Sequence, residues 1–316
     1  MNNIEKYAMT DEDVKIGIND FLTQILIEAR RKKNNIRSLC DMKSKKPTVV
    51  YVVGQPGSGK TSLMNMIDDE FEQIGEIATE IGGDKISTFH KYYDELLELP
   101  PNECYIITRQ FSNRASSYIT QVLMENKINI KKESCLNKGE TDIQKIKKFR
   151  EKGYNITAYV MAVDKYESFL SCIERDIKLV ELGYNPRPVA RMNHDRMYEP
   201  LIQAVNQLES NGLAENIKIF TRGKTINKPQ QVYSKGSNAN LYRNAQEAII
   251  EERFKERRKL LRSPEEYINR IKSAKDNIKL LMSDQQMKNM YLKELNSLEN
   301  EFYNELACDR DFEIDI

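Results

Sequence analysis

The sequence predicts an α/β fold in which helices flank a parallel sheet, followed by a helical extension at the C-terminus. Three observations support this prediction. Residues 47–53 form an unbroken apolar run rich in β-branched residues, which is typical of a strand buried on both faces. Further short apolar runs alternate with polar segments of helical periodicity, the pattern of a parallel sheet. Strand signals stop after about residue 238. We therefore expect a core over residues 1–238 and an extension over 239–316.

The elements of the core are expected in a regular order. A helix over residues 11–35 starts beside acidic residues and ends in the basic run 30–33, an arrangement that complements the helix dipole. The strand at 47–53 is followed by a helix over 63–71 and a second strand at 76–81. Later strands are expected at 104–107, 128–130, 159–163 and 217–220, and helices at 113–126, 141–152, 165–183 and 195–211. The run 104–107 is equally compatible with a helix.

The extension is expected to form a helical hairpin. Residues Ser263 to Glu266 read as a capping box with proline at the first helical position, so a new helix should begin there. A further helix over about 284–306 would pack back on it. Two interpretations of this hairpin stay open, a solvated appendage and a surface that binds a partner.

Composition excludes several functional classes. The 316 residues carry 49 Lys plus Arg against 48 Asp plus Glu, a net charge of +1 that argues against a globally basic nucleic-acid binder. No apolar stretch approaches the roughly 18 residues of a membrane span, so we expect a cytoplasmic protein without membrane contact. The five cysteines lack CxxC spacing, which indicates reduced thiols.

A phosphate loop follows the first strand directly. Residues 54–61 read GQPGSGKT and fit the pattern GxxxxGK[ST] between a strand and a helix. Glycines let successive backbone N–H groups surround phosphate oxygens at a helix N-terminus. Lys60 would reach the β- and γ-phosphates, and the Thr61 hydroxyl would bind Mg²⁺. The expected binding residues for ATP or GTP are Gly54, Gln55, Pro56, Gly57, Ser58, Gly59, Lys60, Thr61 and Ser62. The fold class is therefore expected to be P-loop NTPase-like.

Triphosphate binding by itself leaves a kinase, an NTP-hydrolysing switch and a nucleic-acid motor open. A motor normally needs an apolar strand that ends in acidic residues, and the chain has no such run. This favours a small phosphotransferase over a motor.

Three blocks of the sequence resemble the zeta toxin family, the kinase halves of toxin–antitoxin pairs. The first is the phosphate loop, where Gln-Pro-Gly-Ser is more specific than the general motif. The second, residues 83–96, is similar to the family pattern GDxFRxxHPxxDEL. The third comprises YVMAV at 159–163, IER ending at Arg175 and AR ending at Arg191. The resemblance covers about residues 14–235. It implies an ATP-dependent small-molecule kinase that phosphorylates the 3′-hydroxyl of UDP-N-acetylglucosamine.

The resemblance also implies roles for individual residues. Asp84 would be the catalytic base, a role that requires hydrogen-bond reach of the acceptor hydroxyl. It follows an expected strand and should lie at the carboxyl edge of the sheet, near the phosphate loop. A helix N-cap or turn aspartate is the alternative. Arg175 and Arg191 would stabilise charge on the transferred group together with Lys60, with Arg187 and Arg196 as competitors for that assignment.

The departures from the family pattern fall on the acceptor side. Where the family has EGT followed by arginine, this chain keeps Glu133 but has Cys135 and Asn137, and the arginine of GDxFR is Ser87. Losing a guanidinium removes a bidentate partner for an anionic group of the substrate. Glu133 and Cys135 are the expected acceptor-binding residues with Asp84, and a surface glutamate is the alternative for Glu133.

We therefore expect a kinase that transfers the γ-phosphoryl group of ATP or GTP to a hydroxyl of a nucleotide sugar and acts as a toxin. The resemblance implies a small helical antitoxin as a possible partner. Two other functions stay open. One is an effector-type kinase with an acceptor such as NAD, and the other is a nucleotide-dependent regulatory module whose C-terminal helices report the nucleotide state to a partner.

Overall fold

The computed structural model describes residues 3–37, 46–223 and 228–314 of the chain, with only the backbone described at residues 29–37, 84, 101, 102 and 309–314. Cys40 therefore lies outside the described part, as do the side chains of the basic run 30–33. The four described cysteines are free thiols, in agreement with their spacing.

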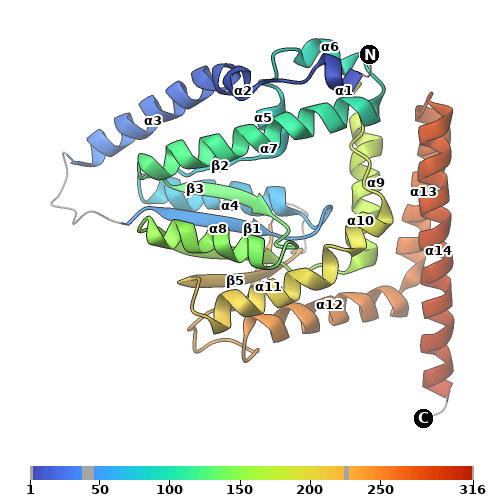
Figure 1. The fold of residues 1–316 in the computed structure, drawn as a ribbon. Helices are drawn as coiled ribbons and strands as arrows, with labels where there is room; N and C mark the ends of the chain where they lie inside the picture. Colours follow the sequence, from blue (N-terminus) through green and yellow to red (C-terminus); the bar gives the residue numbers. More distant parts are fainter. Residues whose placement is uncertain (1–2, 38–45, 224–227, 315–316) are drawn as a thin grey trace.

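A six-stranded sheet forms the centre of the molecule (Figure 1). Its order is β2-β3-β1-β4-β5-β6, and all neighbours are parallel except β6, which runs antiparallel to β5. The strands are β1 (Thr48–Val53), β2 (Thr79–Ile81), β3 (Ile130–Ser134), β4 (Asn155–Met161), β5 (Asn216–Thr221) and β6 (Gln230–Ser234). The predicted fold class is confirmed. The sequence did not indicate β6, because this edge strand has only Val232 and Tyr233 as apolar residues.

Helices cover both faces of the sheet. On one face, α4 (Lys60–Gln73) packs against the even-numbered residues of β1. On the other, the odd-numbered residues of β1 belong to the large core that includes α7 (Pro101–Glu125), α8 (Glu140–Glu151), α11 (Tyr198–Ser210) and α12 (Ala245–Arg262). The short helices are α1 (Asn3–Lys6), α5 (Gly83–Ser87), α6 (Tyr93–Leu97) and α10 (Arg191–Asp195). Successive side chains of a strand point to opposite faces of the sheet, so a strand that is apolar throughout needs helices on both faces.

Two sequence predictions in the first third of the chain were wrong in detail. Residues 104–107 lie inside α7 and not in a strand, because Cys104, Ile107 and Phe111 are buried at helical spacing. The helix expected over 11–35 is divided into α2 (Asp11–Gly17) and α3 (Asn19–Arg37). Thr10 caps α2 in a capping box with Asp13.

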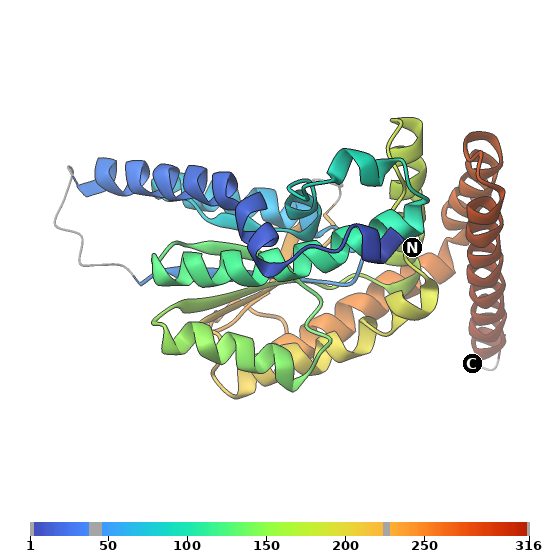
Figure 2. The same ribbon diagram turned by 45° about the horizontal axis from the view of Figure 1, so that its top comes forward.

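The C-terminal hairpin consists of α13 (Pro264–Leu281) and α14 (Gln285–Ile314), in agreement with the prediction. Figure 1 and Figure 2 show these two helices at the opposite end of the molecule from α3. They form a separate apolar core with α9 (Lys165–Glu181). The predicted capping box is wrong: Ser263 makes no side-chain cap of α13, and its N–H, which Glu266 would accept from in such a box, donates to the Lys259 carbonyl at the end of α12. In the described part of the chain, no helix is long and apolar enough to cross a membrane.

Candidate active site

The phosphate loop joins the carboxyl end of β1 to the first residue of α4. Gly57 and Gly59 have φ angles of +73° and +95°, in the left-handed region that favours glycine. A Cβ atom added to Gly57 would lie 1.9 Å from the backbone oxygen of Ser168 in α9. The loop therefore packs tightly on α9 and turns into α4, whose N-terminus supplies backbone N–H groups and the positive end of the helix dipole.

Lys60 lies across this loop. Its Nζ donates to the backbone oxygens of Gly54 and Gln55, both at 3.0 Å. Thr61 is exposed at the start of α4 and lines the adjoining cleft with Ser62. The hydroxyl of Ser58 is fully buried and has no hydrogen-bond partner among the described residues. These positions place an ammonium, a hydroxyl and a helix N-terminus on one side of the loop.

The side chain of Gln55 anchors the loop from behind. Its amide nitrogen donates to the Val163 carbonyl at 2.7 Å and to Ser168 Oγ at 3.1 Å, and Arg253 of α12 donates to its carbonyl oxygen at 3.2 Å. Gln55 is fully buried. Because its side chain is used within the protein, Gln55 can serve a bound phosphate only through its backbone. The loop glycines have no side chain and can likewise contact a phosphate only through their backbone.

A cleft of about 1930 Å³ opens in front of the loop, along the carboxyl ends of the parallel strands. This is the edge where α/β proteins bind ligands. One side, which we call the donor side after its expected role, is lined by the phosphate loop, Ser171, Glu174, Arg175, Arg187, Arg196, Arg222 and Arg270. The other, which we call the acceptor side in the same sense, is lined by Gly82, Gly83, Lys85, Ser87, Glu133, Cys135, Asn137 and Lys138. One cleft thus joins most of the residues that the sequence singled out.

Glu133 and Cys135 lie where the acceptor side meets the phosphate loop. Glu133 is paired in register with Val52, one residue before the end of β1. Burial raises the pKa of the Cys135 thiol, so this side chain is a neutral group. The side chain of Asp84 lies outside the described part. Its backbone is in the first turn of α5, where Gly82 holds the N-cap position, so Asp84 is not the cap of this helix.

The family model described as Zeta toxin matches residues 33–247, more than half of the chain. The chain belongs to the zeta toxin family. It is 30% identical over 223 residues to Toxin zeta of Streptococcus pyogenes, which covers 70% of this chain and 72% of that relative. It is 26% identical to Toxin PezT of Streptococcus pneumoniae over 60% of this chain and 76% of the relative.

Solved structures support the fold. A structure from the PezAT toxin–antitoxin system of Streptococcus pneumoniae matches with a TM-score of 0.65 at 20% identity, over 87% of this chain and 99% of that one. The complex AvrRxo1-ORF1:-ORF2 with ATP matches with a TM-score of 0.53 at 12% identity, over 91% of this chain and 86% of that one. The hairpin α13–α14 lies beyond the residues that match the zeta toxin model.

The two arginines assigned through the zeta toxin resemblance occupy different environments. Arg175 lines the cleft, donates to Asp176 Oδ1 at 3.0 and 2.8 Å and donates to the Arg187 carbonyl at 2.9 Å. Arg191 does not line the cleft; it is bonded to Glu301 of α14 and lies 3.6 Å from Asp195. Its buried NH1 nitrogen has no partner within the described residues. The structure therefore brings Arg175 to the phosphate loop and does not bring Arg191.

Sequence reasoning missed a row of charged residues that lines the donor side of this zeta toxin family site. Arg222, just after β5, is bonded to the carbonyl of Gly57 and lies 3.2 Å from Glu167. Glu167 also accepts two bonds of 2.9 Å from Arg270 of α13. The position of Arg222 after an apolar strand was a usable signal. Arg270 had none, because only the packing of the hairpin on α9 brings it to the cleft.

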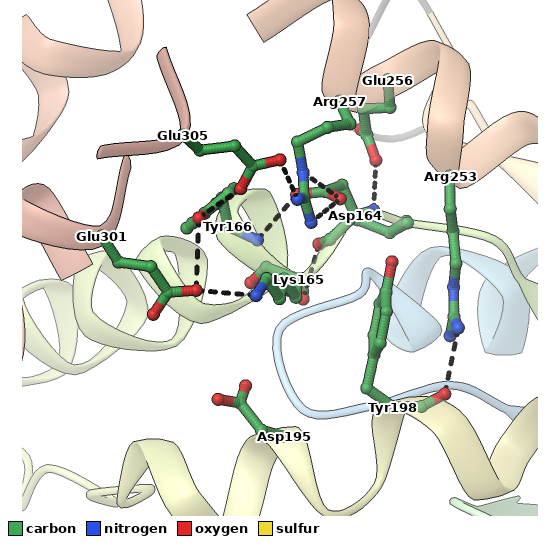
Figure 3. Close-up of polar contacts among 12 residues, drawn as sticks. Asp164, Lys165, Tyr166, Asp195, Tyr198, Arg253, Glu256, Arg257, Glu301 and Glu305 are labelled. Atoms are coloured by element: carbon green, nitrogen blue, oxygen red, sulfur yellow. Dashed lines mark hydrogen bonds and ion pairs between the residues drawn. The ribbon is translucent and has the colours of Figure 1, made fainter. Parts of the chain in front are cut away.

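A second polar cluster joins the hairpin to the start of α9 (Figure 3). Asp164 caps α9 through its bond to the N–H of Tyr166 at 2.8 Å and accepts two bonds from Arg257. Arg257 also donates to Glu305 of α14 at 2.6 Å, and the Tyr166 hydroxyl donates to the same residue. Burial raises the pKa of the neighbouring Glu256 to about 7. Val163, the residue before Asp164, accepts the hydrogen bond from the Gln55 side chain. Polar contacts therefore connect α14 to the phosphate loop through the start of α9.

Gly57 offers a direct test of this packing. Gly57→Ala is expected to lower the free energy of unfolding by about 2–5 kcal/mol, the sum of left-handed strain and overlap with α9. Gly153→Ala is the matched control, since it also has a positive φ of +80° but nothing within 4 Å of the added Cβ. It should cost only about 1 kcal/mol. Chemical denaturation measures both, and equal losses would contradict the close approach of the loop to α9.

Proposed function

We propose that this protein is a kinase that transfers the γ-phosphoryl group of ATP or GTP to a hydroxyl of a nucleotide sugar, with UDP-N-acetylglucosamine as the first candidate, and thereby acts as a toxin. One observation carries the proposal: a single cleft joins Lys60 and the phosphate loop to Arg175 on one side and Glu133 on the other. Membership of the zeta toxin family supports the same reaction class. ATP in the AvrRxo1-ORF1:-ORF2 crystal supports ATP as the donor.

Positioning and charge neutralisation carry such a reaction. The loop N–H groups and Lys60 hold the donor phosphates, and Arg175 offsets charge on the transferred group. Asp84 accepts the proton of the acceptor hydroxyl, whose oxygen forms the new bond to the γ-phosphorus while the bond to the nucleoside diphosphate oxygen breaks. Asp176 and the Arg187 carbonyl fix the Arg175 guanidinium, which limits its loss of entropy on binding.

The side chains that could bind a metal here fit a Mg²⁺ ion that is held mainly by the phosphates of the substrate. Thr61 places a hydroxyl oxygen at the start of α4 in the cleft, the kind of ligand that Mg²⁺ accepts. The described residues contain no group of three or more His, Cys, Asp or Glu that could hold a metal by themselves. Bound Mg²⁺ would neutralise the phosphate charge.

A small antitoxin protein is the proposed macromolecular partner. Structural neighbours of the chain come from a PezAT toxin–antitoxin system and from complexes of AvrRxo1-ORF1 with ORF2. Nothing in the net charge of +1 favours a nucleic acid instead.

The function is tested by mixing the protein with γ-labelled ATP or GTP and, in separate reactions, UDP-N-acetylglucosamine, NAD and a metabolite extract. We expect one added phosphate on UDP-N-acetylglucosamine by mass spectrometry. A phosphorylated NAD would identify an effector-type kinase instead. Release of free phosphate without any phosphorylated acceptor would contradict the kinase proposal and favour a nucleotide-dependent regulatory module.

A further inference from the structure

On the sheet face opposite α4, the cleft continues between α7 and α8. We call this part the α7–α8 chamber. It is defined by Tyr51 and Lys132 on the sheet, Ser116 and Thr120 on α7, and Asp142 and Lys145 on α8, all of which line the cleft. Tyr51 and Lys132 are direct neighbours in the register of β1 and β3. The chamber is therefore built on the two strands that also end at the phosphate loop and at Glu133.

Two consecutive lysines of β3 differ in how their charges are neutralised. Lys131 points to the α4 face, is buried and forms ion pairs with Asp68 and with Glu80, the latter at 3.3 Å. Lys132 points to the opposite face, into the chamber, because side chains alternate along a strand. Within the described residues it forms no ion pair and no hydrogen bond. Burial and the nearby Lys145 lower the pKa of Lys132 to about 8, and Asp142 opposes this shift only in part.

The other polar groups of the chamber offer Lys132 little compensation. Asp142 already accepts a bond from the Lys138 N–H at 2.9 Å and lies 4.0 Å from Lys145. Tyr51 as a residue is 4% exposed, and its hydroxyl, which lines the cleft, has no hydrogen-bond partner in the part of the chain that is described. A half-buried ammonium and a hydroxyl that reaches the surface of the cleft are thus directed at the same space. The described residues neither pair the ammonium nor bond the hydroxyl, and an anion between them would bind to both.

We propose that the α7–α8 chamber binds a phosphate or diphosphate group of the acceptor substrate, with Lys132 and Lys145 as the cations and Tyr51 as a hydrogen-bond donor. The assignment to the acceptor rests on the proposed kinase function, because the donor phosphates occupy the loop. Ser87 and Asn137 on the acceptor side are uncharged, and the chamber lysines add to the positive charge that Lys85 and Lys138 supply there. Lysine binds phosphate as a point charge, which tolerates more acceptor geometries than an arginine fork.

The test measures binding of inorganic pyrophosphate by calorimetry while a non-hydrolysable ATP analogue with excess Mg²⁺ saturates the phosphate loop. Lys132→Met removes the charge at similar length, and Tyr51→Phe removes only the hydroxyl. We expect pyrophosphate to bind about 10- to 100-fold more weakly to Lys132→Met, with unchanged affinity for the ATP analogue. Lys147→Met is the matched control, because Lys147 is on the same helix as Lys145 but does not line the cleft.

Turnover separates this inference from the proposed acceptor. With UDP-N-acetylglucosamine, Lys132→Met should raise KM for the acceptor and leave KM for ATP unchanged. Pyrophosphate binding that depends on Lys132 without any turnover of UDP-N-acetylglucosamine would support the chamber and contradict that acceptor. Equal pyrophosphate affinity of wild type, Lys132→Met and Tyr51→Phe would overturn the chamber. Lys132→Met removes a half-buried charge without an ion partner among the described residues, so we expect it to fold. Melting temperatures within a few degrees of wild type would show that each variant is folded.

Discussion

Lys60→Ala is expected to reduce kcat/KM for phosphoryl transfer by on the order of 10²–10³-fold, the effect of removing one preorganised charge from a transition state. The ammonium lies 3.0 Å from two loop carbonyls, where it can move to the donor phosphates without a change of backbone. Nucleotide binding should weaken as well, because the charge also contacts the ground state. Fluorescent ATP analogue titration and single-turnover transfer measure the two effects separately.

Lys178→Ala is the matched control for Lys60, since Lys178 lies on exposed α9 surface and, among the described residues, pairs only with Glu181. It should leave binding and transfer at wild-type values. The loop of Lys60→Ala should stay folded, because Gln55, Arg253 and Arg222 hold it from behind. Unchanged nucleotide affinity in Lys60→Ala would show that the nucleotide binds elsewhere.

Asp84→Ala is expected to abolish transfer while nucleotide binding stays nearly intact. Loss of a general base costs on the order of 10²–10⁴-fold in kcat, and the residue is in α5, from which Gly83, Lys85 and Ser87 line the acceptor side of the cleft. The contrast between kcat and nucleotide affinity distinguishes this role from a structural one. Equilibrium binding of the ATP analogue and transfer to the acceptor are the two measurements.

Asp94→Ala serves as the comparison for Asp84, because Asp94 belongs to the same sequence block but is exposed on α6. Its turnover should match wild type. Asp84→Asn keeps the size of the side chain and removes the basic oxygen, so it should be as inactive as Asp84→Ala. Full turnover in Asp84→Asn would mean that another group accepts the proton.

The C-terminal hairpin has a more direct role in the site than either interpretation of its sequence indicated. Glu266 and Arg270 of α13 line the donor side of the cleft, and the Tyr291 hydroxyl of α14 donates to Asp176 at 2.7 Å. Asp176 in turn holds Arg175. The extension thus contributes to the wall of the nucleotide site and to the placement of its arginine. The proposed division at residue 238 also leaves α12 on the extension side, although Ala245, Ala248 and Ile249 belong to the core of the sheet.

The strand–loop–helix unit and the parallel sheet could be read from the chain because their signals are local. An unbroken β-branched run and the pattern GxxxxGK[ST] each depend on neighbouring residues. The same locality led to the misassignment of residues 104–107, since four apolar residues fit a strand or a helix until Phe111 is seen packed beside them. The edge strand β6 was not predicted for a related reason: it buries only one apolar side chain, which is too few to give a strand pattern in the sequence.

Long-range contacts decided the rest of the site. Phosphate-loop residues were predictable from their own motif, but the sequence could not show that Gln55 is used inside the protein or that Arg191 is held by Glu301, 110 residues away. It could not show either that Lys131 is neutralised while Lys132 faces a chamber, since strand partners and helix faces set that difference. A motif specifies backbone geometry over a few residues. Which charges meet across the cleft depends on packing between elements distant in the chain.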